Sequence, residues 1–229
     1  RNYLNKNKNA DNFKFMQVST DEVFGDLSLD ELPCNEDKSY NPSSPYSASK
    51  ASADHLVRAW SRTFNVPTII TNCTNNFGPF QFPEKLIPVT IKNIFSRQNI
   101  PIYGDGNQIR DWIYVDDHVR ALSKVMISGR INETYNISGD NNISNLRLVE
   151  KICDIMDEKL IYKKEYKVSS RDFITFVKDR EGHDFRYALD SSKIRKELNW
   201  MPIENIESGL EKTIEWYLKN DSWIKEVLK

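Results

Sequence analysis

A tyrosine and a lysine four residues apart are a first pair whose types and spacing suit catalysis. Tyr46 and Lys50 lie in the segment PYSASKA, residues 45–51. On a helix, a spacing of four places both side chains on one face. A nearby ammonium group stabilises a phenolate and lowers the pKa of the phenol from its usual value near 10. Such a phenol can act as a general base on a hydroxyl, although most Tyr–Lys pairs at this spacing are simply solvated.

Two adjacent acids form a second candidate centre. Thr20, Asp21 and Glu22 closely follow an apolar run at residues 13–18. If burial keeps Asp21 protonated while Glu22 stays ionised, the two carboxyls can divide acid and base roles. Adjacent residues at the end of a strand point in opposite directions, so both reach one substrate only if the chain curls there. The alternative is an acidic surface turn or a helix cap.

Apolar and β-branched runs separated by helical patterns indicate the elements that position these residues. Polar side chains follow the runs that end at Val18 and Cys73. They are typical of the carboxyl edge of a parallel sheet, where open α/β sheets bind ligands. The strand–helix–strand order predicts a parallel α/β fold. Strands are expected at 13–18, 68–73, 100–103 and 135–138, and helices at 45–64, 86–96, from Asp116 or Asp117 to Met126, 144–160, 191–198 and 206–218.

The composition argues against several classes of protein. Lys and Arg number 32 and Asp and Glu 33, for a net charge of −1, which argues against a nucleic-acid partner. No apolar run approaches the roughly 20 residues of a membrane helix, and the N-terminus does not resemble a signal peptide. Cys34, Cys73 and Cys153 form no CxxC pair and are odd in number. We therefore expect a soluble protein of the cytoplasm without a disulfide framework.

Five motifs follow one another in an order that is more specific than any one of them. Together they resemble the nucleoside-diphosphate-sugar 4,6-dehydratases of the extended short-chain dehydrogenase family, from about residue 13 to the last helix. The motifs are STDEVFG (19–25), PYSASKA (45–51), NNFGPFQFPEKLIP (75–88), GDG leading to RDW (104–112), and DREGHD (179–184).

The resemblance implies a role for each candidate catalytic residue. Tyr46 would take the proton of the sugar 4-hydroxyl as hydride leaves C4 for NAD. Lys50 would lower the pKa of Tyr46 and bind the nicotinamide ribose, and Thr20 would hydrogen-bond the 4-oxygen. Glu22 would remove the C5 proton and Asp21 would protonate the departing 6-hydroxyl, before hydride returns to C6. The acid pair separates this reaction from that of related epimerases, which need no acid at C6.

The same resemblance implies the binding residues. Arg110 and Arg180 would fork onto the diphosphate, Asn75 would contact the sugar or its phosphate, and residues 101–103 would flank the nucleobase. Asn76 would face the nicotinamide side of NAD. The implied cofactor residues are Tyr46, Lys50 and Asn76, the substrate residues are Asn75, Lys85, Leu86, Pro101, Ile102, Tyr103, Arg110, Asn145, Asp179, Arg180 and His183, and no metal is implied.

Three features depart from the family's pattern. Phe24 stands where Tyr is common, and Glu181 stands where Pro is common, beside the diphosphate contacts. The family's NAD site opens with a Gly-rich turn after the first strand, but the GxG at 104–106 has Ile109 in the place of the third glycine. We therefore expect about three strand–helix units of roughly 30 residues each to precede this segment in the intact enzyme. The 229-residue chain alone is expected to be inactive.

The predicted fold is the C-terminal part of a Rossmann-like parallel sheet interleaved with a smaller α/β substrate-binding domain. Residues 1–75 and 111–140 are assigned to the Rossmann-like domain, and 76–110 and 141–229 to the substrate domain. The expected function is NAD-dependent dehydration of a nucleoside-diphosphate-glucose in deoxysugar biosynthesis of the rhamnose type. The residues do not identify the nucleobase; dTDP-glucose is the expected substrate.

Other functions stay open at this point. The chain can be a non-catalytic fragment that binds a nucleotide sugar or a partner, or part of a related sugar-nucleotide epimerase or decarboxylase. A homodimer is expected for the intact enzyme, because the helix at 45–64 presents Ala53, Val57, Trp60 and Phe64 on one side.

Overall fold

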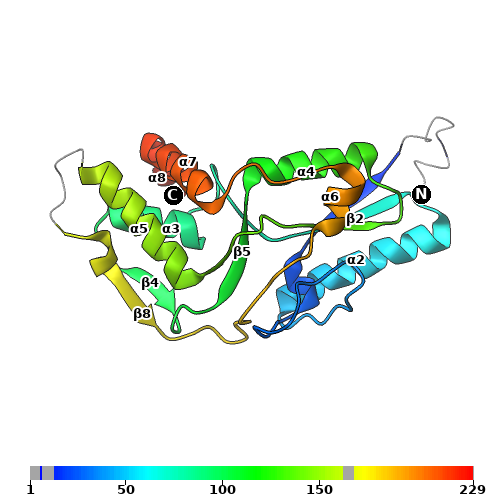
Figure 1. Ribbon diagram of the computed structural model, residues 1–229, viewed down its shortest axis with the longest axis horizontal. Helices are drawn as coiled ribbons and strands as arrows, with labels where there is room; N and C mark the ends of the chain where they lie inside the picture. Colours follow the sequence, from blue (N-terminus) through cyan, green and yellow to red (C-terminus); the bar gives the residue numbers. More distant parts are fainter. Residues whose placement is uncertain (1–5, 7–12, 162–167, 229) are drawn as a thin grey trace.

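The computed structural model describes Lys6 and residues 13–161 and 168–228. The first residues of the predicted Rossmann-like segment and residues 162–167 lie outside this part. Figure 1 shows an elongated molecule with a group of helices and strands towards each end and the strand β5 (Ile109–Tyr114) running between the groups. Each group has its own hydrophobic core.

A three-stranded parallel sheet forms the centre of the first group. Its strands lie in the order β1 (Phe15–Thr20), β2 (Thr68–Cys73) and β6 (Thr134–Ile137). Helix α2 (Pro45–Phe64) packs on one face, and α4 (Val115–Ser128) lies on the other (Figure 1). Because both faces are covered, β2 is buried almost along its whole length and shows no alternation. The prediction of a parallel α/β fold is confirmed.

Helix α2 has the bounds that its sequence predicts. Ser44 and Ser47 cap each other, since each side-chain oxygen accepts from the other's backbone N–H, at 3.1 and 3.0 Å. Pro45 occupies the first helical position, where its missing N–H costs nothing. Asn65 ends the helix in the left-handed conformation, with φ of 52°. These caps fix the helical turn that carries Tyr46.

The second group packs helices around short strands. Strand β5 pairs in parallel with β3 (Asn75–Phe77) and antiparallel with β7 (Asn142–Ser144), and β4 (Ile100–Tyr103) pairs in parallel with β8 (Ile174–Val177). The helices are α3 (Leu86–Phe95), α5 (Asn145–Ile161), α7 (Ile206–Lys219) and α8 (Asp221–Val227). One face of α5 is buried: Leu148, Ile152, Met156 and Leu160 all belong to this core.

Helix α6 (Ser192–Leu198) returns to the first group after the chain has built most of the second. Its Ile194 and Leu198 are buried in the same core as Ile69 of β2 and Tyr135 of β6. The chain therefore crosses between the groups more than once, as an interleaved arrangement requires. The residue boundaries of the four predicted segments stay a prediction.

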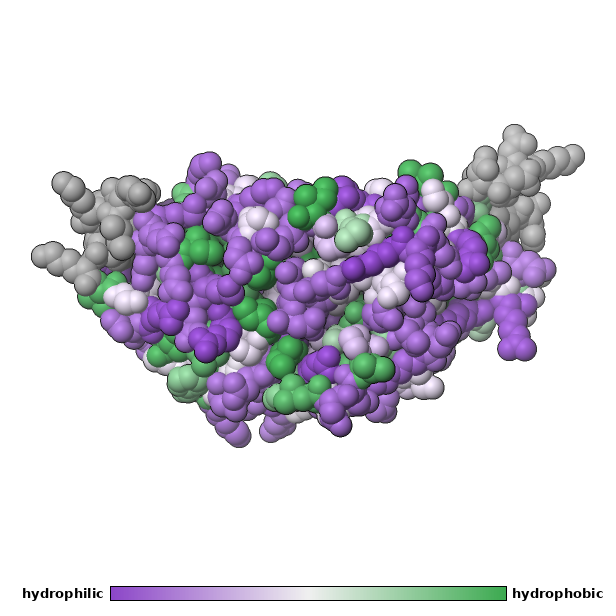
Figure 2. Space-filling view, viewed as in Figure 1, coloured by the Kyte–Doolittle hydropathy of each residue, from purple (hydrophilic) through white to green (hydrophobic). Residues whose placement is uncertain are grey.

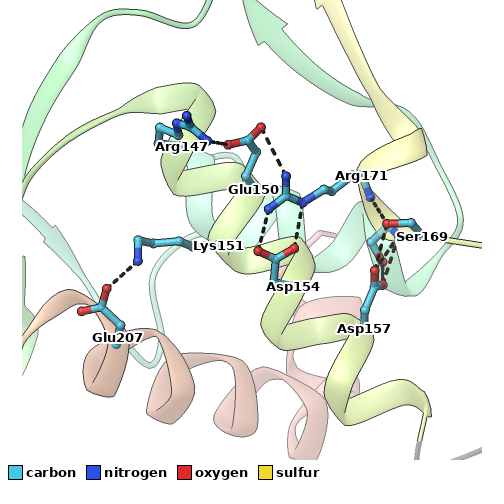
Figure 3. Close-up of polar contacts among 9 residues, drawn as sticks. Arg147, Glu150, Lys151, Asp154, Asp157, Ser169, Arg171 and Glu207 are labelled. Atoms are coloured by element: carbon cyan, nitrogen blue, oxygen red, sulfur yellow. Dashed lines mark hydrogen bonds and ion pairs between the residues drawn. The ribbon is translucent and has the colours of Figure 1, made fainter.

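Ion pairs fasten the segment before β8 to helix α5 (Figure 3). Arg171, in the 3-10 turn η3 (Ser170–Phe173), donates to both carboxylate oxygens of Asp154, at 2.7 and 2.6 Å, and lies 3.5 Å from Glu150. A forked guanidinium contact fixes direction as well as distance. These contacts set where β8 begins, and β8 leads into residues 179–184.

The first predicted strand ends two residues too early. Ser19 and Thr20 continue the parallel ladder opposite Asn72 and Cys73, so β1 ends at Thr20 and not at Val18. Polar side chains are compatible with strand geometry here because Ser19 and Thr20 are buried and hydrogen-bonded. The acid pair therefore follows the strand directly.

The predicted start of α4, at Asp116 or Asp117, is also wrong. The helix begins before Asp116 and Asp117 and has no side-chain cap. The buried carboxylate of Asp117 instead accepts from the backbone N–H groups of Ile203 and Glu204, at 3.0 and 2.8 Å, and pairs with Arg120. Asp117 thus anchors the segment that leads into α7.

The face of the molecule seen in Figure 2 is mainly polar. Figure 2 shows hydrophilic residues over most of the visible face, with hydrophobic residues in small separate groups. In the part of the chain that the structure describes, no helix is both long and apolar enough to cross a membrane.

Candidate active site

A cleft of about 610 Å³ brings together residues that are far apart in the sequence. Its walls include the 3-10 turn η2 (Asp21–Phe24), strands β3, β4 and β5, and residues 180–184. Ten of the eleven predicted substrate residues line it, as do Glu22 and Asn76; these ten are Asn75, Lys85, Leu86, Pro101, Ile102, Tyr103, Arg110, Asn145, Arg180 and His183.

The turn η2 gives two adjacent acids different surroundings. Thr20 caps the turn: its hydroxyl oxygen accepts from the Glu22 N–H at 3.3 Å and the hydroxyl donates to Asp21 Oδ1 at 3.1 Å. Because the chain curls here, Asp21 is only 4% exposed, whereas Glu22 lines the cleft. The chain therefore has the curl that a shared role of the two acids requires.

The surroundings of Asp21 favour its protonated form. Burial, and next the charge of Glu22, raise the pKa of Asp21 from 3.8 to about 7, while the Thr20 hydroxyl acts in the opposite direction. Asp111 raises this pKa further and Arg110 lowers it. Asp21 Oδ2 is buried and has no hydrogen-bond partner among the described residues. A carboxyl with a pKa near 7 retains its proton in a large fraction of molecules at neutral pH and can act as a general acid.

Glu22 is the better base of the two. Burial raises its pKa too, but Arg110 opposes this shift most strongly, and Arg180 and Lys85 add to the opposition. Asp184 is the nearby acid that raises the pKa. Cations around a partly exposed carboxyl favour its ionised form. The two acids thus differ in the direction that separate acid and base roles require.

The Tyr46–Lys50 pair differs from the sequence prediction. Lys50 Nζ donates to the Val18 carbonyl at 2.8 Å, so its ammonium is turned towards the end of β1. Partial burial, and then the charges of Glu22 and Cys73, raise the pKa of Tyr46 above 10. The predicted lowering of this pKa by Lys50 is therefore wrong for this arrangement of the side chains. The Tyr46 side chain remains accessible, since the residue is 55% exposed.

Arg110 anchors one wall of the cleft. It lies on β5 and is 7% exposed. Its guanidinium donates to the carbonyl oxygens of Asp184, at 2.7 Å, and Phe185, at 3.2 Å, and lies 4.3 Å from the centre of the Tyr187 ring. These contacts hold the loop that carries Arg180, and they place a buried positive charge near the acid pair.

Arg180 and His183 form a second pair on the cleft wall. Arg180 Nη2 lies 2.9 Å from His183 Nε2, and the guanidinium lies 5.3 Å from the centre of the Tyr103 ring. Asp179, the predicted substrate residue that does not line the cleft, lies 2.7 Å from His183 Nδ1. Its carboxylate contacts His183 and Gln108 and does not line the cavity.

The wall formed by β3 and the following loop is held by amide side chains. Asn75 pairs with Trp112 in the β3–β5 ladder, and both line the cleft. Gln81 Nε2 donates to the Asn76 carbonyl at 2.9 Å, and Asn76 Nδ2 donates to the Thr74 carbonyl at 3.1 Å. Asn76 Oδ1 keeps no partner among the described residues. Gln81 thus ties the loop after β3 back to that strand, beside the cavity.

Nine lining residues were not predicted. Six of them lie inside the five motifs, so the sequence marked their segments although no binding role was assigned to them. Tyr187, Val89 and Ser44 lie outside the motifs, and the sequence gave no sign that they would line the cleft. The nine are Ser44, Gln81, Glu84, Val89, Trp112, Glu181, Gly182, Asp184 and Tyr187.

The residues present fit one end of a dinucleotide. Tyr46 and Lys50 lie at the start of α2 beside the end of β1, and Asn76 offers an unpartnered amide oxygen near the end of β2. The GxG at 104–106 joins β4 to β5 and opens no helix. Helix N-terminal amides are what hold a pyrophosphate in a Gly-rich turn, so this segment does not supply that part of an NAD site.

Comparisons with known proteins agree with this arrangement. A family model described as GDP-mannose 4,6 dehydratase matches residues 2–213. The dTDP-glucose 4,6-dehydratase of Neisseria meningitidis is 54% identical over 216 residues, which are 94% of this chain and 61% of the relative. The same enzyme from Bacillus anthracis, solved in complex with NAD, superposes with a TM-score of 0.84 at 41% identity and covers 93% of this chain and 64% of that one.

A further solved structure carries a nucleotide as well. The dTDP-glucose 4,6-dehydratase of Streptomyces venezuelae, with NAD and TYD bound, superposes with a TM-score of 0.86 at 37% identity and covers 93% of this chain and 62% of that one. The chain therefore spans somewhat less than two thirds of the length of these relatives.

Proposed function

The chain belongs to the GDP-mannose 4,6-dehydratase family, and from that premise we propose that it carries the catalytic and substrate-binding residues of an NAD-dependent dTDP-glucose 4,6-dehydratase, a hydro-lyase. The family resemblance inferred from the five motifs is confirmed. The observation that carries the proposal is the single cleft that ten predicted substrate residues share with Glu22, with Asp21 next to it in the chain.

The first part of the reaction takes place at C4 of the sugar. Tyr46 removes the proton of the 4-hydroxyl, and Thr20 hydrogen-bonds the 4-oxygen. The accessible phenol of Tyr46 supports this role. When bound, NAD would supply a hydride acceptor for C4 and a hydride donor for C6. Lys50 and Asn76 hold its nicotinamide end, and Lys50 must then turn from the Val18 carbonyl towards the ribose.

The second part removes water across C5 and C6. A ketone at C4 acidifies the C5 proton, which Glu22 takes up, and Asp21 gives its proton to the 6-hydroxyl as the C6–O bond breaks. Glu22 then returns its proton to C5, and the product is the 4-keto-6-deoxy sugar. The raised pKa of Asp21 and the cations near Glu22 support this division of roles.

The remaining cleft residues hold the nucleotide. Arg110 and Arg180 suit the diphosphate, because a guanidinium can fork onto two oxygens. Residues 101–103 and Asn145 flank the nucleoside, and Asn75 contacts the sugar. The pathway is deoxysugar biosynthesis of the rhamnose type, and the assembled enzyme is a cytoplasmic homodimer.

The test joins this chain to an upstream unit that contains a Gly-rich turn and supplies NAD with dTDP-glucose. Formation of the 4-keto-6-deoxy sugar, followed by its absorbance in alkali, is the expected result, and Glu22→Gln should abolish it. UDP-glucose, as the matched alternative substrate, should react more slowly. Inversion at C4 without loss of water would instead indicate an epimerase. Nucleotide-sugar binding without any product would indicate a non-catalytic binding protein.

A further inference from the structure

His183 lies between the carboxylate of Asp179 and the guanidinium of Arg180 on the cleft wall. Its side chain is 4% exposed, with Asp179 Oδ1 at 2.7 Å from Nδ1 and Arg180 Nη2 at 2.9 Å from Nε2. A carboxylate beside Nδ1 places the ring proton on that nitrogen. Nε2 then carries a lone pair, which accepts from Arg180. In this arrangement the ring is neutral and Arg180 covers its second nitrogen.

The acid side of this arrangement is built rigidly. Gln108 Nε2 donates to Asp179 Oδ2 at 3.0 Å, and Gly104 lies so close that a Cβ there would come within 2.7 Å of the same oxygen. Gly104 has φ of 60°, which favours glycine independently. Asp179 is therefore fixed by β4–β5 turn residues, and it fixes the tautomer of His183 in turn.

Arg180, on the other side of the ring, can change its hydrogen-bond partner. Arg180 rests on the Tyr103 ring, and both residues line the cleft. Within the described residues, no carboxylate forms a salt bridge with Arg180, and its hydrogen bond to a neutral imidazole is weaker than one to an anionic oxygen. A diphosphate in the cleft therefore competes for this guanidinium on favourable terms.

The charges around the ring decide its proton affinity. Burial lowers the pKa of His183 below 6.5, Arg180 and Arg110 of β5 lower it further, and Asp179 raises it. The other charged side chains that line the cleft are Glu22 of η2, Glu84 and Lys85 before α3, and Glu181 and Asp184 of the same loop as His183. An added anion opposes burial and the guanidiniums, since it favours the charged form of the ring.

We propose that His183 binds the diphosphate as a cation. Binding of the nucleotide sugar draws Arg180 from Nε2 to a phosphate oxygen. Nε2 then takes up a proton from solvent, and its N–H donates a hydrogen bond to the diphosphate. Asp179 acts as a positioning residue that keeps the Nδ1 proton in place. This inference rests on the proposed function of the cleft. It gives the diphosphate a third cation, beside Arg110 and Arg180, that exists only when the ligand is bound.

The test measures the protons taken up when this chain binds dTDP-glucose without added NAD. The diphosphate of a nucleotide sugar is esterified at both ends, so it lacks the second phosphate ionisation near pH 6 of a terminal phosphate, and any uptake belongs to the protein. Calorimetry at pH 7.5 in two buffers of different ionisation enthalpy should give an uptake of roughly 0.3–1 proton per ligand. By linkage, the association constant should then fall about 2–10-fold per pH unit above neutrality.

Matched variants separate His183 from the other histidines. His183→Gln should bind more weakly and take up no proton. Asp179→Asn should reduce the uptake. His55→Gln changes an exposed histidine of α2 that does not line the cleft, and it should leave both affinity and uptake unchanged.

Titration of the wild-type chain by NMR gives a second readout that needs no variant to fold, because the sequence has only three histidines. The resonance of His183 should titrate below 6.5 in the free chain and at higher pH with dTDP-glucose bound. Binding with no proton uptake, or with equal uptake in His183→Gln, would overturn this inference and leave the proposed function standing. No binding of dTDP-glucose at all would overturn both.

Discussion

Asp21 and Glu22 leave the same 3-10 turn in different directions: the Asp21 carboxyl is buried behind the turn with one oxygen unpartnered, and the Glu22 carboxyl lines the cleft among cations. Burial raises the pKa of both carboxyls, but the cations Arg110, Arg180 and Lys85 oppose that rise at Glu22, whereas at Asp21 the charge of Glu22 adds to it. That difference is what turns a pair of acids into an acid and a base.

The proposed acid can be removed without changing its size. In an enzyme that joins this chain to its Gly-rich unit, Asp21→Asn keeps the hydrogen bond to Thr20 but has no carboxyl proton to give. We expect turnover to fall by roughly 10²-fold or more, as for loss of a general acid, while oxidation at C4 survives. Reduced cofactor should then accumulate on the enzyme, which its absorbance in the near ultraviolet would report. Full turnover in this variant would remove Asp21 from the mechanism.

The same substitution should stabilise the chain above neutral pH. The pKa of Asp21 is raised from 3.8 to about 7 in the folded chain, so its contribution to stability is fully present below pH 3.8 and is lost as the pH rises through 7. The amide of the variant does not ionise and has no such loss. By linkage, the unfolding free energy of Asp21→Asn should exceed that of wild type by about 2–4 kcal/mol at pH 8, as measured by urea denaturation.

The advantage of the variant should shrink to less than about 1 kcal/mol near pH 4, where Asp21 is protonated in the folded chain and about 40% protonated in the unfolded one. Asp37→Asn makes the same change at an exposed position; as a matched control it should change the unfolding free energy little. Glu22 and Asp111 also have raised pKa values, so wild type and variant will share part of the trend. An equal stability difference at pH 4 and pH 8 would show that Asp21 is ionised normally.

Sequence patterns correctly located those helices and strands whose ends are set by residues close by in the chain. Helix α2 has a proline at its first position and strong caps, and its bounds were predicted correctly, as were those of β2 and β4. The strand β5 was not predicted, although it carries Arg110 and connects the two groups. Its residues IRDWIY mix charge with aromatic character, because Arg110 and Asp111 are buried in contacts made by other parts of the chain. Local patterns do not contain that information.

The candidate site shows the same contrast between what local sequence predicts and what depends on contacts between distant segments. The motifs predicted which residues would meet, because their order is specific to the family. They did not predict the partners that set each side chain's state, such as the Val18 carbonyl for Lys50 or His183 for Asp179. Those contacts depend on the distances between segments in the folded chain. The strands β3, β7 and β8 and the helix α8 were also missed, since three- and four-residue strands and a seven-residue helix carry little periodic signal.

Helix α2 is expected to form the dimer interface of the assembled enzyme. Leu56, Trp60 and Phe64 recur at a spacing of four and are 62, 46 and 39% exposed, and the Trp60 and Phe64 rings lie 4.8 Å apart. Three exposed apolar side chains in one stripe are more than a solvated helix needs. Trp60→Lys should convert a dimer to monomers in sedimentation velocity at micromolar concentration, whereas Ala59→Lys, which places the same charge beside the stripe, should have a smaller effect. A wild-type enzyme that is monomeric under these conditions would contradict the interface.

The 229-residue chain by itself is expected to bind NAD weakly and to be nearly inactive. Hydride transfer requires the nicotinamide at near-attack distance from C4, and such orientation is worth roughly 7–11 kcal/mol of the barrier. In the proposed arrangement Tyr46 and Lys50 hold only the nicotinamide end of NAD, and the GxG at 104–106 opens no helix that could hold the pyrophosphate. Supplying the Gly-rich unit should therefore change NAD affinity far more than it changes affinity for the nucleotide sugar.

The measurement should therefore compare the affinity of the chain for NAD with its affinity for the nucleotide sugar. The cleft residues that suit the nucleotide lie on β3, β4, β5 and the 179–184 segment, and the three strands contribute Phe77, Ile102 and Trp112 to the core of the second group. The proposed NAD side lies instead next to β1, which pairs with β2 alone among the described strands and leaves Phe15 and Val18 exposed. An unpaired apolar edge of this kind also favours aggregation. Calorimetry on the chain alone should detect dTDP-glucose but not micromolar NAD, and tight NAD binding with rapid product formation would show that the chain holds a complete cofactor site.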